Sequence, residues 1–428
     1  MNEIKKIAAA VKADSFRMAC LSGEARNDAL RAMAIALADN CDGIARANEA
    51  DLDAGEKAGL AAPLLKRLKF DGEKIADVIA GTRDLIKLPD PVGRILLQRE
   101  LDKGLILTRV SCPIGVIGVI FESRPDALVQ IAALCLKSGN CAILKGGSEA
   151  KRTNRVLFEI LHAAGTDAGV PAGFLTLLES RSDIDELLTC HESIDLIIPR
   201  GSNAFVRHIM DRSDIPVMGH SDGVCHVYVD RAADIGKAVA VIRDSKVQYP
   251  AACNAAETIL VHADIAEALL PPLWDELKSK GVLMRGTPRI AGILPDVEPA
   301  TEEDNRTEYL DFIVSLAVTD SIDEAIEHIN TYGSHHTDCI VTEDEAAAER
   351  FLQLVDSAGV YQNCSTRFAD GFRYGFGAEV GIGTGKLHAR GPVGLEGLAT
   401  YKYLLRGDGH IVADYAEGRR HFRFKDLR

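Results

Sequence analysis

One cysteine lies in a run of small residues, within the stretch QYPAACNAAETILVH that covers residues 248–262. Alanine or asparagine fills every position from two before Cys253 to three after it, so no bulky side chain crowds the sulfur. A thiol nucleophile needs that access, because a substrate and a cofactor must both approach it. The competing interpretation is a structural thiol, since free cysteines are among the most buried residues. Cys253 is therefore a candidate nucleophile whose role the rest of the chain must decide.

Two glycine-containing turns follow apolar, strand-like runs and are candidate phosphate sites. Backbone N–H groups at a helix start favour an anion, and glycine allows its close approach. Carboxyl ends of strands are also where open α/β sheets bind ligands. The alternative is an ordinary strand-to-helix turn. The candidate residues are Pro199, Arg200, Gly201 and Ser202 in IIPRGSN, and Lys145, Gly146, Gly147 and Ser148 in AILKGGSEA.

Other glycine, cysteine and histidine patterns carry weaker signals. The stretch GAEVGIGTGK, residues 377–386, lacks the spacing of a P-loop and predicts a turn-rich loop. No GxGxxG motif follows the first predicted strand, so the usual dinucleotide fingerprint is absent. The ten cysteines show no CxxC spacing, which favours free thiols. His335 and His336 are neighbours that a strand would point to opposite faces, so we predict no metal site.

Alternating helices and strands must position these residues. The first ninety residues show the apolar spacing of amphipathic helices. Residues 95–112 hold two apolar runs around Asp102-Lys103-Gly104, which predicts a hairpin arm. From Pro113 onward strands and helices alternate in two series that meet near residue 230. This pattern predicts βαβ units and parallel, doubly wound sheets in two domains, as the length of 428 residues also favours.

Composition limits the classes of partner. Hydrophobic residues make up 47% of the chain and charged residues 26%, as in ordinary globular proteins, and no segment has membrane-spanning length. The formal net charge of -14 argues against a nucleic-acid partner, which needs a basic surface. The amino-terminal stretch has no signal-peptide pattern. We therefore expect a cytoplasmic protein with a small-molecule substrate, no nucleic-acid partner and no membrane association.

Taken together, the motifs resemble the aldehyde dehydrogenase superfamily. The resemblance rests on PIGVIGVIFESRPD, AILKGGSEA, IIPRG, YPAACNAAETILVH and residues 363–396, and it extends to about Arg406. Its most specific pieces are FESRPD, PAACNAAET and KLHARGP. Within the superfamily the chain is most similar to the acyl-phosphate reductases of proline biosynthesis. The resemblance implies NADPH-dependent reduction of L-glutamyl 5-phosphate to L-glutamate 5-semialdehyde, with release of phosphate, through a thioester on Cys253.

The resemblance also implies the roles of individual residues. Cys253 matches the nucleophile, its backbone N–H is the expected oxyanion donor, and Asn254 belongs to the catalytic set. The NADP(H) set is Lys145, Gly146, Gly147, Ser148, Pro199, Arg200, Gly201, Ser202 and Glu308. The candidates for binding the anionic substrate are Ser123, Arg124, Arg367 and Arg390.

The chain departs from the wider superfamily in three places. PVMGHSDGV, residues 216–224, replaces the motif that carries a water-activating Glu, so the thioester should persist until phosphate or NADPH consumes it. Ser148 replaces the acidic residue that holds the ribose 2′-hydroxyl of NAD, which favours NADP(H). Ser123 or Arg124 replaces the asparagine that donates to the oxyanion, and the sequence leaves the choice between them open.

The fold implied is an aldehyde-dehydrogenase-like α/β architecture with two Rossmann-type domains and a small β arm for oligomerisation. The expected parts are a cofactor-binding domain over residues 1–228, interrupted by the arm at 95–112, a catalytic domain over 229–365, and residues 366–428, which form an active-site loop and return to the first domain. The resemblance predicts a homo-oligomer and a functional association with glutamate 5-kinase, the enzyme that makes the acyl phosphate.

Three other functions compete with this interpretation. A hydrolytic aldehyde dehydrogenase is disfavoured by PVMGHSDGV. A cofactor-free thiol hydrolase or acyltransferase would use Cys253 with His220, His226 or His262 as its base. A binding protein without chemistry would tolerate the loss of Cys253.

Overall fold

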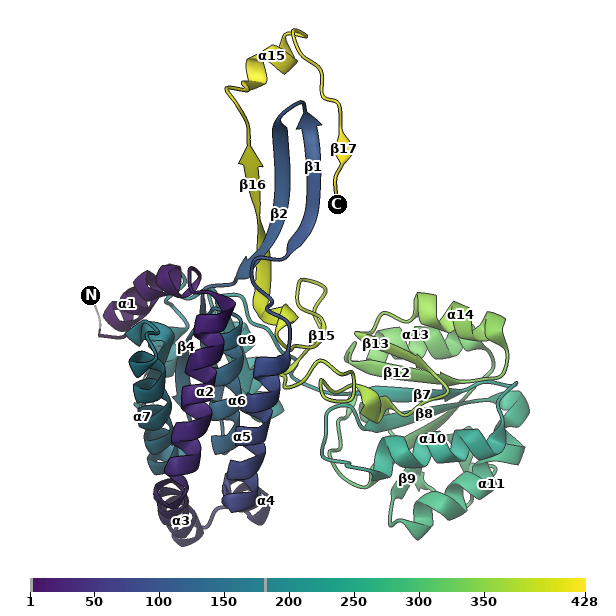
Figure 1. Cartoon of the computed structure of the whole chain (residues 1–428). Coiled ribbons are helices and arrows are strands. Elements are labelled where there is room, and N and C mark those ends of the chain that lie inside the picture. Colours follow the sequence, from purple (N-terminus) through teal and green to yellow (C-terminus); the bar gives the residue numbers. More distant parts are fainter. Residues whose placement is uncertain (1–2, 181–182) are drawn as a thin grey trace.

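Two sheets of parallel strands and an antiparallel arm organise the molecule (Figure 1). The structure is a computed structural model that describes residues 3–180 and 183–428. The first sheet has four strands in the order β5-β4-β3-β6, and the second has seven in the order β10-β9-β11-β8-β7-β12-β13. The expected α/β class with Rossmann-type domains is confirmed.

The amino-terminal helices pack into one core with the first sheet. Short polar side chains begin two of them: Ser22 Oγ accepts the Ala25 N–H at 3.1 Å, and Asp71 Oδ1 accepts the Lys74 N–H at 3.2 Å. These caps satisfy backbone donors that the first turn of a helix leaves open. The helices are α1 (Glu3–Met18), α2 (Gly23–Asp39), α3 (Cys41–Lys57), α4 (Ala62–Leu68) and α5 (Gly72–Lys87).

The first sheet places the two glycine turns at its carboxyl edge. Strands β3 (Val116–Phe121) and β4 (Cys141–Gly146) are buried along their whole length, as expected for central parallel strands covered on both faces. Val217 forms a single parallel bridge to Ile197. The other elements are α6 (Pro125–Lys137), η1 (Ser148–Ala150), α7 (Lys151–Asp167), η2 (Ala172–Phe174), β5 (Leu175–Leu178), α8 (Asp183–Leu187), β6 (Leu196–Arg200) and α9 (Asn203–Arg212).

The second sheet begins earlier than predicted. β7 (Cys225–Val229) pairs with β8 and β12, so this strand, assigned by sequence to the first domain, belongs to the second sheet. The short strands β9 and β10, which end this sheet on one side, were also missed, since neither shows a strand period. The elements are α10 (Ile235–Val247), β8 (Ala256–His262), α11 (Ala263–Ser279), β9 (Leu283–Gly286), α12 (Pro288–Ala291), β10 (Glu298–Pro299), η3 (Glu302–Arg306), β11 (Ile313–Thr319), α13 (Ile322–Tyr332), β12 (Thr337–Val341), α14 (Glu345–Leu354) and β13 (Gly359–Gln362).

The arm projects away from both sheets (Figure 1). Its hairpin joins β1 (Ile95–Asp102) to β2 (Leu105–Pro113) at the predicted turn, where Gly104 takes a φ of +79° that favours glycine. The carboxy-terminal strands complete an antiparallel sheet in the order β16-β2-β1-β17. These last elements are β16 (Ala399–Arg406), α15 (Val412–Ala416) and β17 (Lys425–Asp426).

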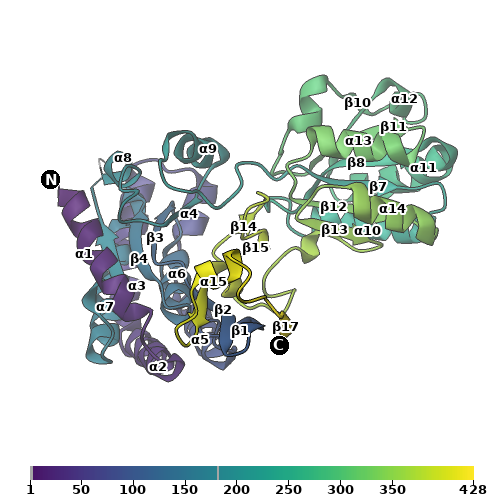
Figure 2. The ribbon, with the colours of Figure 1, turned by 90° about the horizontal axis from the view of Figure 1, so that it is seen from above.

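The segment between β13 and β16 crosses from the second sheet back to the first domain (Figure 2). Val380, Val393 and Leu398 bury their side chains in the first domain's core. This segment holds η4 (Thr366–Phe368), β14 (Ile382–Gly383), β15 (Gly391–Pro392) and η5 (Glu396–Leu398). No helix in the described part of the chain is long and apolar enough to cross a membrane.

Candidate active site

Cys253 lies in the turn between α10 and β8, at the amino edge of the second sheet, and its side chain is half-buried. Gly223 packs directly against this turn. A Cβ at residue 223 would lie 2.1 Å from the Cys253 carbonyl oxygen and 2.7 Å from its Cα, so no side chain fits there. Gly223, the second glycine of PVMGHSDGV, therefore fixes the position of the cysteine.

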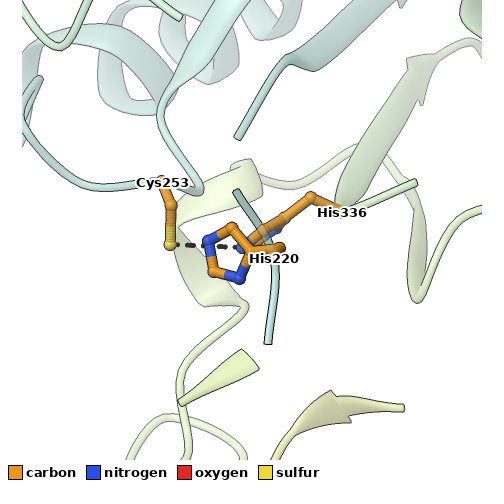
Figure 3. Close-up of side chains that lie close together, drawn as sticks. All are labelled: His220, Cys253 and His336. Carbon is orange, nitrogen blue, oxygen red and sulfur yellow. Dashed lines mark hydrogen bonds between the residues drawn. The ribbon is translucent and has the colours of Figure 1, made fainter. Parts of the chain in front are cut away.

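His336 contacts the sulfur, with its Nε2 3.2 Å from Cys253 Sγ (Figure 3). The histidine is buried and directly precedes β12, and its Nδ1 is 2.9 Å from Thr337 Oγ1. Sequence reasoning missed this residue because it treated the histidine pair as neighbours within a strand. A better signal was available: His336 and Cys253 both come just before predicted parallel strands, and such strands begin at the same edge of a sheet.

His220 completes a cluster with Cys253 and His336, whose candidate ligand atoms lie within 4.8 Å of one another (Figure 3). Its Nδ1 is 2.8 Å from the carbonyl oxygen of Ile382, in the segment that crosses between the domains. Burial lowers the pKa of His220, so the ring is neutral at neutral pH.

The other two histidines considered as bases lie elsewhere. His226 Nδ1 is 2.9 Å from Asp338 Oδ1, and both side chains are fully buried in the second sheet. His262 accepts the Asp264 N–H at 3.2 Å and so begins α11 at the carboxyl end of β8. That end is opposite the edge that carries Cys253.

Two predicted arginines lie close enough to Cys253 for their charges to interact with its thiolate. Burial lowers the pKa of Arg200, as does the neighbouring charge of Arg124, whereas Glu379 and Cys253 act in the opposite direction. Burial likewise lowers the pKa of Arg367, and Cys253 again opposes the shift. Arg200, predicted as a cofactor residue, is thus placed toward the nucleophile.

The other two arginines among the substrate candidates are exposed. Arg124 begins α6 on the surface beside Arg200. Arg390 forms an ion pair with Asp356, 3.1 Å from its Oδ1, and Lys386 lies 2.6 Å from the other carboxylate oxygen. These two cations lower the pKa of Asp356 and anchor the crossing segment to the second domain.

Ser123 has its donors engaged within the chain. Its backbone N–H and its hydroxyl both donate to Glu149 Oε1, at 2.6 and 2.7 Å. The residue has a φ of +44°, in the left-handed region that few non-glycine residues adopt. In this arrangement neither Ser123 donor is directed at an oxyanion. The hydrogen bonds to Glu149 would have to break before Ser123 could donate to one.

Asn254 joins the cysteine turn to the crossing segment. Its side chain is buried, and Nδ2 donates to the Ala369 carbonyl oxygen at 2.8 Å. Its Oδ1 has no hydrogen-bond partner among the described residues. The structure therefore gives Asn254 a positioning contact beside the nucleophile.

Glu379 is a carboxyl group that sequence reasoning missed. Burial raises its pKa to about 7, although the Gly371 N–H, which donates to Oε2 at 2.9 Å, and the charge of Arg200 oppose the shift. The signal was its position as an acidic residue inside GAEVGIGTGK, a stretch that we interpreted as a turn-rich loop. Glu379 provides Arg200 with a nearby opposite charge.

The turn after β4 borders a hollow between α7 and β5. Lys145 is buried, and its Nζ donates to the Gly146 carbonyl oxygen at 2.6 Å. Ser148 begins the 3₁₀ turn η1, and α7 starts three residues later without a side-chain cap. The lining residues are Gly146, Gly147, Ser148, Lys151, Asn154, Leu177, Leu178 and Glu179.

The turn after β6 binds the carboxylate of Glu122, a residue of the same chain. The Ser202 N–H donates to Glu122 Oε2 at 3.2 Å, and a Cβ at Gly201 would lie 2.6 Å from the same oxygen. Pro199 pairs with β3 inside the strand. A carboxylate thus occupies the position where a phosphate oxygen would accept from the start of α9, so this turn fits a phosphate group.

Glu308 links the two sheets. Its carboxylate accepts a hydrogen bond from Asn203 Nδ2 at the start of α9, and burial raises its pKa. Asn203 also donates to Asp222 Oδ1 at 3.1 Å. The carboxyl edge of the first sheet therefore meets the amino edge of the second at this point, as it does at Arg200 and Cys253.

Comparison with known proteins agrees with this geometry. Residues 2–282 match the model of the aldehyde dehydrogenase family. A gamma-glutamyl phosphate reductase from Ruminiclostridium cellulolyticum is 57% identical over 425 residues, covering 99% of this chain and 98% of the relative. The crystal structure of the Thermotoga maritima gamma-glutamyl phosphate reductase is 39% identical, with a TM-score of 0.94 over 96% of this chain and 100% of that one. An acetylating aldehyde dehydrogenase from Geobacillus thermoglucosidasius, 18% identical with a TM-score of 0.66 over 96% of this chain and 97% of that one, shares the fold. The chain therefore belongs to the aldehyde dehydrogenase family and, within it, to the gamma-glutamyl phosphate reductases.

Proposed function

We propose that this protein reduces L-glutamyl 5-phosphate to L-glutamate 5-semialdehyde with NADPH and releases phosphate, as the second step of proline biosynthesis from glutamate. The observation that carries the proposal is the 3.2 Å contact between Cys253 Sγ and His336 Nε2, at the edge where the two sheets meet. The full-length similarity to gamma-glutamyl phosphate reductases supports the choice of substrate.

His336 prepares the nucleophile in this mechanism. Its Nε2 accepts the thiol proton, and the Cys253 thiolate attacks the carbonyl carbon of the acyl phosphate. A carbon–sulfur bond forms, the bond from carbon to the phosphate oxygen breaks, and phosphate leaves with the electron pair. The product on the protein is a thioester.

The cations beside Cys253 suit an anionic substrate and an anionic leaving group. The guanidinium groups of Arg200 and Arg367 both interact with the charge of Cys253, and Arg367 is buried whereas Arg200 is half-buried. A buried guanidinium binds phosphate or carboxylate more strongly than an exposed one. We therefore add Arg200 to the proposed substrate set, and we assign Arg390 to holding the crossing segment through Asp356.

The fate of the thioester follows from the missing base. PVMGHSDGV supplies Gly223 as packing for Cys253, and it holds no Glu that could activate water there. The thioester therefore persists until it is reduced or until phosphate reverses its formation. NADPH, when bound, supplies the hydride that converts the thioester to the aldehyde and returns the thiolate.

The residues at the carboxyl edge of the first sheet fit NADP(H). The Ser202 N–H donates a hydrogen bond to the carboxylate of Glu122. It could donate to a phosphate oxygen of the cofactor in the same way. Ser148 and Lys151 line the hollow at β4 and provide a hydroxyl and a cation for a ribose 2′-phosphate. We expect a higher kcat/KM with NADP than with NAD, and equal values would contradict this assignment.

The experiment follows NADP reduction by absorbance with L-glutamate 5-semialdehyde, with and without inorganic phosphate. We expect reduction to require both phosphate and the Cys253 thiol, so that Cys253→Ser is inactive. Reduction without phosphate would mean that water resolves the thioester and that the protein is a hydrolytic aldehyde dehydrogenase. An active Cys253→Ser variant would exclude the thioester altogether.

A cofactor-free thiol hydrolase remains the second candidate, because Cys253 and His336 alone form a thiol–imidazole pair. It predicts no NADP binding and hydrolysis of thioesters without a nucleotide. Equilibrium binding of NADP to the intact protein distinguishes the two functions.

We further propose that the protein is a cytoplasmic homo-oligomer whose subunits pair through the arm. The exposed residues Tyr401, Tyr403 and Leu405 alternate along the edge strand β16 and so lie on one face of it. An exposed apolar edge strand is a common site of subunit pairing. Because acyl phosphates are labile, we also propose a functional association with glutamate 5-kinase.

A further inference from the structure

We propose that Cys253, His220 and His336 form a Zn²⁺ site, and that Zn²⁺ is a reversible inhibitor of this protein. A thiolate and two imidazoles are the ligands that Zn²⁺ prefers in proteins, and three of them leave a fourth position for water. The candidate ligand atoms lie within 4.8 Å of one another, and the sulfur and His336 Nε2 are 3.2 Å apart. Ligand atoms around tetrahedral zinc are roughly 3.3–3.6 Å apart, so a small movement of His220 or Cys253 completes the geometry.

The hydrogen bond to Ile382 prepares His220 as a ligand. A carbonyl oxygen can only accept, so His220 Nδ1, 2.8 Å away, carries the ring hydrogen and Nε2 presents its lone pair. Histidines that bind metals commonly donate their other N–H to a carbonyl in this way. Figure 3 shows a ring nitrogen of His220 on the side of the Cys253 sulfur.

The surroundings of Cys253 explain why the site would be reversible and inhibitory. Binding replaces the thiol proton, which is released to solvent, and the zinc–sulfur bond occupies the electron pair that attacks the substrate. Arg200 and Arg367 place positive charge near the same sulfur and oppose a cation. Zn²⁺ and the acyl phosphate therefore compete for one thiolate.

The test measures alkylation of the thiol, so its result does not depend on the proposed reaction. All variants in this test are made in a protein that carries Cys20→Ser, which removes an exposed thiol, and this protein is the parent. Iodoacetamide labelling of Cys253 is quantified by peptide mass spectrometry while ZnCl₂ is varied. We expect Zn²⁺ to slow labelling, and His220→Gln to require at least ~10-fold more Zn²⁺ for the same protection. His208→Gln, on the exposed surface of α9, is the matched control and should leave the Zn²⁺ requirement unchanged.

Two results would overturn the proposal. If His220→Gln and the parent need the same Zn²⁺ concentration, the ion does not use His220 and the three-residue site is wrong. The labelling rate of His220→Gln without metal shows whether the thiol itself was disturbed. Co²⁺ added in place of Zn²⁺ gives an independent measurement, since a thiolate-to-cobalt absorption band should appear in the parent and be lost in Cys253→Ser. Absence of that band from the parent would equally contradict the site.

Discussion

The two adjacent histidines have different surroundings. His336 directs Nε2 at the Cys253 sulfur, whereas His335 directs Nδ1 at the Asp356 carbonyl oxygen, 2.6 Å away. His335 also has a φ of +59°, a conformation that asparagine tolerates better than most residues. The pair therefore offers a catalytic candidate and a neighbouring control for the same substitution.

We expect His336→Asn to lower kcat by ~10²- to 10⁴-fold at neutral pH, because the thiol loses its proton acceptor. The loss should shrink as the pH rises, since the thiol then ionises into solvent without help. The pH dependence of kcat for NADP reduction measures both effects. His335→Asn should retain nearly full activity, and an equal loss in both variants would indicate a structural role for the pair.

Glu379 makes the stability of the fold depend on pH. Its pKa rises from 4.5 to about 7 on folding, so the folded chain holds a proton that the unfolded chain releases between these values. The free energy of unfolding therefore falls as the pH rises from about 4.5 to 7, and the full cost of the buried charge is present above pH 7.

Glu379→Gln removes this pH-dependent cost. Relative to the parent, the variant should gain roughly 1–3 kcal/mol in the free energy of unfolding between pH 5 and pH 8, allowing for the partial exposure of Glu379. Urea denaturation at the two pH values measures the gain. The exposed Glu349→Gln should show none, and a pH-independent difference for Glu379→Gln would contradict the raised pKa.

Among the elements, three segments meet at the active-site edge: the turn before β8, the start of β12 and the stretch before β7. Gly223 allows the last of these to pass against the backbone of Cys253. Asn254 adds a hydrogen bond to the crossing segment through Ala369. The position of the nucleophile therefore depends on contacts between segments that are distant in the sequence.

Gly223→Ala should displace the cysteine turn, because the new Cβ would lie 2.1 Å from the Cys253 carbonyl oxygen. We expect at least a ~10²-fold loss of kcat, since small displacements of reacting groups carry costs of that size. Circular dichroism should show the fold retained. Gly43→Ala, in α3 with no atom within 4 Å of its new Cβ, should keep full activity and unfold no earlier. An active Gly223→Ala variant would mean that the turn adjusts freely.

Over the whole molecule, the arm stands apart from both sheet domains (Figure 1). Its strand β16 is exposed along nearly its whole length. A four-stranded antiparallel sheet with such an edge gains stability by pairing with another copy.

The double substitution Tyr403→Asp and Leu405→Asp should convert the oligomer to monomers, because buried carboxylates oppose association. Light scattering coupled to size-exclusion chromatography measures the mass. Lys402→Glu, on the opposite face of the strand, should leave the assembly unchanged. An unchanged mass in the double variant would place the subunit contact elsewhere.

The sequence by itself determined the α/β class, the hairpin turn at Gly104, the helix start after Ser202 and the candidacy of Cys253. Each depends on local properties: hydrophobic period, turn chemistry and the size of neighbouring residues. The domain boundary near β7 was misplaced, because a buried parallel strand has the same continuous apolar pattern whichever of the two sheets it joins.

Only the tertiary structure decided which side chains meet at the sulfur. His336 lies 83 residues from Cys253 along the chain, and the neighbours of Arg200 and Glu379 come from different elements. Arg390 belongs to a family motif, yet it forms an ion pair with Asp356. Glu122 and Glu149 accept hydrogen bonds from Ser202 and Ser123, which the sequence had assigned to bound ligands. Such contacts depend on how the edges of the two sheets face each other, and the spacing of residues along the sequence does not predict that arrangement.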